Sequence, residues 1–257
     1  MTTVTGVLTH LSAERVHEAV QLLTAVSPEA RFVVCYGGER AEFARIELDD
    51  KLFIDDPTLR GPEQHLQSLT LSFQALWHRY FEDDESSDSL YLIEYDHLIL
   101  DAHFEVLLRD LATATKADLM GKNCGDRTAT NDEHYVRFRR DPRLLGHLRR
   151  LSVRDDPSRL FSCLGDGMWI SRRALQAYLA VDHHPPCYVE IYVPTLLHHL
   201  GFRVVDVDTH SDLYRWVRWM PSFGIDQVVA HSRAGTVFMH PVKAAGAVRA
   251  ARKALSL

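Results

Sequence analysis

The feature that most constrains the fold is an alternation of short apolar runs with amphipathic stretches along about the first 125 residues. The runs VTGVLTHL, ARFVVCYGG and KLFIDD are typical of strands, and SAERVHEAVQLLTAV, between the first two, has its apolar residues at helical spacing. A strand, a helix and a second strand in this order form the repeating unit of an α/β sheet. The sequence therefore predicts an α/β fold in which helices flank a central, mostly parallel sheet.

Segments of the same two kinds continue toward the end of the chain. Residues 62–84 carry one apolar stripe at helical spacing, formed by Leu66, Leu69, Phe73, Leu76, Trp77 and Tyr80. Further strands are predicted at 90–101, 117–123 and 203–208, and further helices at 102–115, 172–181 and 188–202. A strand–turn–strand element is expected at 160–171. We expect these segments to form a single domain over residues 1–257.

Composition limits the classes of partner. The net charge of −6 argues against a nucleic-acid or anionic-membrane protein. The first residues lack a signal-peptide pattern, and no run approaches the roughly 20 apolar residues that span a bilayer, so we expect a cytoplasmic protein without a transmembrane segment. The four cysteines have no CxxC spacing, which is typical of reduced thiols without a zinc framework.

The stretch LYLIEYDHLILD places Glu94, Asp96 and His97 inside an otherwise apolar run. A buried carboxylate without a partner is costly, so these groups are expected to be paired, hydrogen-bonded or directed at a ligand. On a strand, residues i and i+2 lie on the same side, so Glu94 and Asp96 can point at one ion. Hard divalent cations prefer such oxygen ligands. The alternative is an acidic strand end paired with nearby arginines.

The order of this stretch and of later motifs resembles the GT-A type of glycosyltransferase, from ARFVVCYGG to FMHPVK. In that family a short acidic motif, usually Asp-x-Asp, holds a divalent cation against the diphosphate of the donor; here it is Glu94-x-Asp96. The resemblance implies a GT-A-like fold, a nucleotide-diphosphate sugar donor, Mg²⁺ or Mn²⁺ as cofactor, and a hydroxyl or amine on a small-molecule or glycan acceptor.

Two further motifs are similar to the acceptor side of such enzymes. GDGMWIS displays Asp166 between two glycines, which also make a good turn in their own right. Glu190, in CYVEIYVPTLLHHLGF, matches the acidic residue at the start of a helix that serves as base or binds the acceptor hydroxyl. Asp166 and Glu190 are therefore the candidate catalytic residues. For Glu190 the alternative is a first-turn acid that complements the helix dipole.

The remaining candidates concern the donor. In FMHPVK, the resemblance implies that His240 completes the metal site or contacts the diphosphate, and that Lys243 offsets phosphate charge. In CYGGER, Tyr36 and Gly37 are candidates for a donor-binding turn after the second strand, although the GxGxxG pattern is lacking. Cofactor-binding candidates are thus Tyr36, Gly37, Glu94, Asp96 and Lys243, and the metal candidates are Glu94, Asp96 and His240.

The predicted function is metal-assisted sugar transfer, with residues 1 to about 125 binding the nucleotide sugar and about 126 to 257 binding the acceptor. One alternative is a nucleotidyltransferase that forms a sugar nucleotide. The segment THLSAERV after the first strand lacks the glycine-rich, basic loop that such an enzyme needs. Another alternative is a non-catalytic nucleotide-binding module. The feature that supports it is the glutamate at position 94, where the motif usually has aspartate. Donor base, acceptor, stereochemistry and oligomeric state also stay open.

Overall fold

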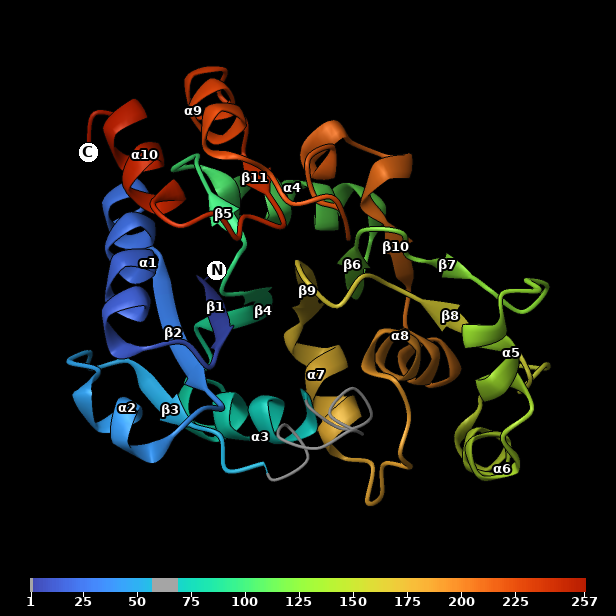
Figure 1. The fold of residues 1–257 in the computed structure, drawn as a ribbon. Helices are drawn as coiled ribbons and strands as arrows, with labels where there is room; N and C mark the ends of the chain where they lie inside the picture. Colours follow the sequence, from blue (N-terminus) through green and yellow to red (C-terminus); the bar gives the residue numbers. More distant parts are fainter. Residues whose placement is uncertain (1, 57–68) are drawn as a thin grey trace.

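The computed structural model describes residues 2–56 and 69–257, and its centre is a seven-stranded sheet of order β10–β6–β9–β4–β1–β2–β3 (Figure 1). Strand β9 runs antiparallel to both of its neighbours, and the other pairings in this sheet are parallel. The predicted α/β fold with a mostly parallel central sheet is therefore confirmed. The strands of this sheet are β1 (Thr2–Thr9), β2 (Arg31–Tyr36), β3 (Lys51–Phe53), β4 (Ser87–Glu94), β6 (Leu119–Gly121), β9 (Met168–Ser171) and β10 (Val204–Asp206).

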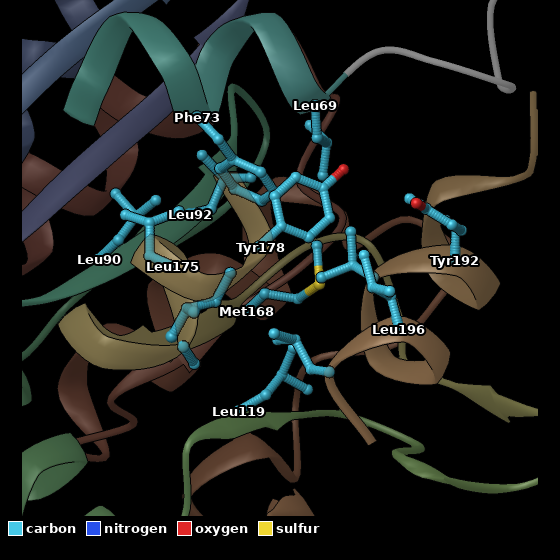
Figure 2. Packing of buried hydrophobic residues seen from close by; sticks show 14 of the residues in the cluster. Leu69, Phe73, Leu90, Leu92, Leu119, Met168, Leu175, Tyr178, Tyr192 and Leu196 are labelled. Carbon is cyan, nitrogen blue, oxygen red and sulfur yellow. The ribbon is translucent and has the colours of Figure 1, made fainter. Parts of the chain in front are cut away.

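Helices cover both faces of the sheet. Alternate side chains of β4 point to opposite faces, and the apolar ones pack in two different clusters. Leu90 and Leu92 pack in one buried cluster with Phe73, whereas Tyr91 and Ile93 belong to a second cluster. Figure 2 shows the first cluster between the sheet and the helices that carry Phe73, Leu175 and Leu196. The α-helices are α1 (Ala13–Val26), α2 (Arg40–Arg45), α3 (Leu69–Tyr80), α4 (Phe104–Thr115), α5 (Glu133–Arg139), α6 (Pro142–Leu151), α7 (Arg172–Leu179), α8 (Val189–His199), α9 (Ile225–Arg233) and α10 (Ala247–Ala254).

Most of the predicted segments are present, but residues 90–101 do not form one strand. Strand β4 ends at Glu94, a turn follows in which the His97 amide donates to the Glu94 carbonyl (3.0 Å), and a separate strand β5 (Leu98–Ile99) begins. Strand β5 pairs with β11 (Phe238–Met239), far along the chain. The argument that Glu94 and Asp96 share one side of a strand is therefore wrong, because Asp96 lies in the turn.

The predicted element at 160–171 also divides between two sheets. Strand β8 (Phe161–Ser162) pairs with β7 (Gly125–Asp126), whereas β9 enters the central sheet. The helix predicted at 62–84 is described from Leu69 onward, and Leu66 lies outside the described residues. Short 3-10 turns at Val207–Thr209 and Asp212–Tyr214 follow β10.

The carboxyl ends of β1, β2 and β4 meet at one edge of the sheet. Leu8 pairs with Cys35 on one side and with Glu94 on the other. In open α/β sheets, ligands bind at this edge. No helix in the described ranges is long and apolar enough to cross a bilayer.

Candidate active site

Three predicted metal ligands converge beyond the carboxyl end of β4. Each of Glu94, Asp96 and His240 offers one ligand atom, and these atoms lie within 4.8 Å of one another. His240 Nε2 is 3.3 Å from Asp96 Oδ1 and 4.0 Å from Glu94 Oε2. Neighbouring ligands of a six-coordinate Mg²⁺ are about 3 Å apart, given metal–oxygen bonds of about 2.1 Å. The spacing therefore suits a cation with these three ligands.

The Asp96 carboxylate is the clearest sign that the cluster is built for a ligand. Asp96 is buried, and neither of its oxygens has a hydrogen-bond partner among the described residues. Its nearest cations are His240 and Lys243, whose Nζ lies 3.6 Å from Asp96 Oδ2. These ion-pair contacts offset the charge of the buried carboxylate, and a cation bound by His240 Nε2 and Asp96 would take the place of the proton on His240.

The backbone fixes the orientation of His240. Its amide donates to the Trp216 carbonyl (3.0 Å), and its side-chain Nδ1 lies 2.9 Å from the Arg218 carbonyl, to which it donates. A histidine bonded in this way through Nδ1 presents Nε2, the usual arrangement of a metal-binding imidazole. Burial opposes a charge on the ring, but Asp166, Asp96 and Glu94 raise the pKa of His240 to about 9.

Glu94 lies at the open side of the cluster, with 45% of its side chain exposed. Partial loss of solvent, together with the Asp166 and Asp96 carboxylates, raises the pKa of Glu94 to about 7. Three carboxylates, those of Glu94, Asp96 and Asp166, surround one histidine and repel any further negative charge. They favour a divalent cation instead.

Asp166 lies beneath these residues and not on an open surface. It is 2% exposed, and it accepts hydrogen bonds from the Glu94 amide (2.7 Å) and from His97 Nδ1 (2.6 Å). Burial alone would raise its pKa, but His97 and His240 hold the pKa of Asp166 below its usual range. Gly167, whose φ of +74° suits glycine, closes this turn through a hydrogen bond to the Leu92 carbonyl (2.9 Å).

Glu190 is the second carboxylate beside the cluster, at the first turn of α8. The Gly165 amide donates to Glu190 Oε1 (2.6 Å), and the Tyr188 hydroxyl also bonds to the Glu190 side chain. A Cβ at position 165 would lie 3.2 Å from Glu190 Oε1, so glycine permits this close approach. Glu94, Gly165 and Glu190 line a cavity of about 100 Å³, which we call the inner cavity.

The predicted donor residues lie around the same edge of the sheet. Lys243 is half-exposed beside Asp96. Gly37 follows β2, and its amide donates to the Thr9 carbonyl (2.9 Å). The Tyr36 side chain is 1% exposed and packs in a cluster with Val34 and Ile46. At this turn a ligand can therefore reach Gly37 more readily than the Tyr36 side chain.

Sequence reasoning missed two features of this site. His97 bonds to both Asp166 and the Tyr91 hydroxyl (3.2 Å), which links the turn after β4 to the interior. The Arg218 carbonyl that orients His240 is 22 residues away along the chain. No local pattern signals either contact, because each depends on segments that meet only in the folded chain.

No protein-family model matches the sequence, and a search of curated proteins finds no significant match. Solved structures of glycosyltransferases match it over its full length. Two structures of the galactosyltransferase LgtC, one with donor and acceptor sugar analogues and one of an active-site mutant, cover 100% of this chain and 96% of theirs, at 15% identity and TM-scores of 0.45 and 0.46. A glycosyltransferase involved in glycosylation of the major capsid of PBCV-1 covers 100% of both chains at 8% identity and a TM-score of 0.42. These values describe a distant likeness of fold, so the function must be argued from the site.

Proposed function

We propose that this protein is a glycosyltransferase that moves a sugar from a nucleotide-diphosphate donor to a hydroxyl or amine acceptor. The observation that carries the proposal is the convergence of the buried Asp96 carboxylate with Glu94, which lines the inner cavity, and with His240. The order of motifs that resembles GT-A enzymes supports it. The amino-terminal half would bind the donor and the carboxy-terminal half the acceptor.

Glu94, Asp96 and His240 would hold Mg²⁺ or Mn²⁺. The carboxylate oxygens of Asp96 and Glu94 and the Nε2 of His240, which faces them, fit a hard cation that accepts oxygen and imidazole ligands. When bound, the cation supplies positive charge that offsets the negative charge of a departing diphosphate. Lys243, which lies 3.6 Å from Asp96, would move its ammonium group toward the phosphates once the cation neutralises that carboxylate.

Glu190 is the residue placed to act on the acceptor. It lines the inner cavity with Glu94, and the Gly165 amide fixes one of its oxygens. If transfer inverts the anomeric centre, Glu190 would accept the proton of the attacking hydroxyl. If transfer retains the configuration, Glu190 would position the acceptor by a hydrogen bond. Asp166, which is buried beneath the cluster, would act as a positioning residue that holds Glu94 and His97.

The first test is the melting temperature of the protein with UDP, GDP, CDP or TDP, each with and without Mn²⁺. A ligand that binds only the folded state stabilises it by about 2.7 kcal/mol at one hundred times its dissociation constant. We expect one nucleotide to raise the melting temperature, and the rise to require Mn²⁺.

Two variants make this test specific. Asp96→Ala should abolish the metal-dependent rise, because it removes the buried ligand. Asp110→Ala, which changes an exposed aspartate on α4, should retain it. A rise that needs no metal would remove the assigned role of Glu94 and Asp96. No rise with any nucleotide would contradict the transferase and favour a binding module that has lost its donor site.

A further inference from the structure

A second and larger cavity adjoins the inner cavity. It has a volume of about 310 Å³ and lies between the start of α3, the end of α7 and the segment that leads into α8. Leu69 and Val189 line both cavities. We call this second space the outer cavity.

The two cavities and the metal-ligand cluster therefore follow one another. Glu94 belongs to the cluster and also lines the inner cavity, which in turn shares Leu69 and Val189 with the outer cavity. The inner cavity thus adjoins the cluster through Glu94 and the outer cavity through Leu69 and Val189. A ligand in the outer cavity would lie one cavity away from the site of transfer.

The outer cavity is lined in part by aromatic side chains that can also form hydrogen bonds. Tyr178, Tyr192 and His184 form a connected wall, in which the His184 ring stacks on Tyr178 with ring centroids 4.6 Å apart. Figure 2 shows the Tyr178 ring within the buried cluster, with its hydroxyl toward Leu69, and Tyr192 at the edge of that cluster. Tyr178 and Tyr192 are 2% and 4% exposed, so they form a fixed boundary of the cavity. The more accessible His184 and Asp182 are polar side chains that a ligand with hydroxyl groups can contact.

Hydrogen bonds hold this wall in place. The Tyr192 hydroxyl lies 2.9 Å from His184 Nδ1 and 3.0 Å from His147 Nε2. The Tyr178 hydroxyl lies 2.8 Å from Thr70 Oγ1. Groups fixed in this way lose little entropy when a ligand binds, so the wall is organised in advance for recognition.

The charge of the lining narrows the chemistry of the ligand. Among the described residues that line the outer cavity, acids are present, including the exposed Asp182, but there is no arginine or lysine. Burial lowers the pKa of His184 to about 4, so this ring adds no positive charge near neutral pH. The acids of this lining would repel a phosphate or carboxylate group, whereas a neutral, hydroxylated unit would meet no such repulsion.

We propose that the outer cavity binds a second, uncharged sugar unit of the acceptor, so that the protein acts on a glycan of at least two units and not on a single sugar. The inference depends on the proposed transferase function. The reacting unit would occupy the inner cavity beside Glu190, and the next unit would occupy the outer cavity beside His184 and Asp182.

Binding can be measured before the donor sugar is known. The protein is saturated with Mn²⁺ and the nucleoside diphosphate that stabilises it. Lactose, cellobiose, maltose and diacetylchitobiose are then titrated by ligand-observed NMR, each beside the methyl glycoside of its non-reducing unit. We expect at least one disaccharide to bind ten-fold or more tightly than its single-sugar counterpart.

A matched pair of variants tests whether the outer cavity is responsible for the tighter binding of the disaccharide. Gln74→Trp introduces a large ring at an exposed position of α3 that lines the outer cavity, and it should abolish the preference for the disaccharide. Gln176→Trp makes the same change at an exposed position of α7 that does not line the cavity, and it should keep the preference. Gln74→Ala, which enlarges the space, checks that any loss comes from filling.

The outcomes separate the two proposals. Equal binding of single sugars and disaccharides, or a preference that survives Gln74→Trp, overturns the outer cavity as an acceptor subsite. If the nucleotide still stabilises the protein in that case, the transferase proposal stands alone. If no nucleotide stabilises the protein, both proposals fail together.

Discussion

At the scale of single residues, the site separates groups that contact a ligand from groups that hold them. Glu94, Asp96 and His240 present ligand atoms to one point, whereas Asp166 and His97 lie beneath them. The sequence predicts the first set because Glu-x-Asp and a late histidine resemble a known motif. It does not predict the burial of Asp166, because a Gly-Asp-Gly turn has the same sequence whether it faces a ligand or the interior.

Asp166→Asn tests the positioning role. The amide keeps the size of the side chain, but it offers only one oxygen to the two donors, the Glu94 amide and His97 Nδ1. Loss of a residue that orients metal ligands typically weakens metal binding by about 10–100-fold. We expect a decrease in Mn²⁺ affinity of that size, measured by electron paramagnetic resonance of free Mn²⁺.

Asp118→Asn is the control for this measurement. Asp118 is also buried and hydrogen-bonded, but its side chain bonds to Ser171, Arg173 and Arg203, outside the cluster. It should lower stability and leave Mn²⁺ affinity unchanged. Wild-type Mn²⁺ affinity in folded Asp166→Asn would show that Asp166 does not position the ligands.

At the scale of elements, the sequence predicts helices from the apolar pattern within one segment, but it does not predict which strands pair. The apolar spacing of α1 and α4 predicts these helices, because each buries one face and exposes the other. The end of β4 at Glu94 was not predicted, because the cause is the pairing of β5 with β11 about 140 residues later. That pairing also brings the segment with His240 to Asp96.

Asp118 joins three elements of the carboxy-terminal side of the sheet. It precedes β6 and accepts hydrogen bonds from Arg173 Nε (2.6 Å) in α7 and from the Arg203 amide (3.1 Å) before β10. Asp118→Ala leaves that partly buried amide without this partner. Hydrogen bonds to charged groups contribute about 1.5–3 kcal/mol, so we expect the free energy of unfolding in urea to fall by about 3 kcal/mol.

Arg173→Ala gives the comparison for Asp118→Ala. The Arg173 side chain is 73% exposed, and without it Asp118 still accepts from Ser171 and Arg203. Water can replace the exposed guanidinium, and the carboxylate keeps two other donors, so Arg173→Ala should cost less than Asp118→Ala. Equal losses in the two variants would mean that the ion pair, and not the buried carboxylate, joins these elements.

At the scale of the whole molecule, the candidate site draws on both halves of the chain. Glu94 and Asp96 come from the amino-terminal half, and Glu190 and His240 from the carboxy-terminal half, while β9 and β10 complete one sheet with β1 to β4. The polar groups of the site gather at one edge of the sheet.

Partly buried histidines away from this edge make the free energy of unfolding depend on pH. His198 provides a test of that dependence. Its ring stacks on Phe161 with centroids 4.1 Å apart, and its Nε2 is buried without a hydrogen-bond partner among the described residues. Burial lowers the pKa of His198 to about 4, with His199, Arg154 and Arg159 adding to the decrease and Asp126 opposing it. Between about pH 6.5 and pH 4 the unfolded chain therefore binds a proton at this position that the folded chain does not.

The stability that a neutral His198 provides is complete above about pH 6.5 and falls as the pH decreases toward 4. His198→Phe keeps the stacked ring and cannot titrate. The wild type should therefore lose on the order of 1 kcal/mol relative to this variant between pH 6.5 and pH 4.5, with allowance for partial exposure of the ring. Differential scanning calorimetry across this range measures the difference, and the other titrating groups cancel between the two proteins. His210→Phe, at an exposed histidine, controls for the loss of one histidine, and parallel curves for the wild type and His198→Phe would refute the prediction.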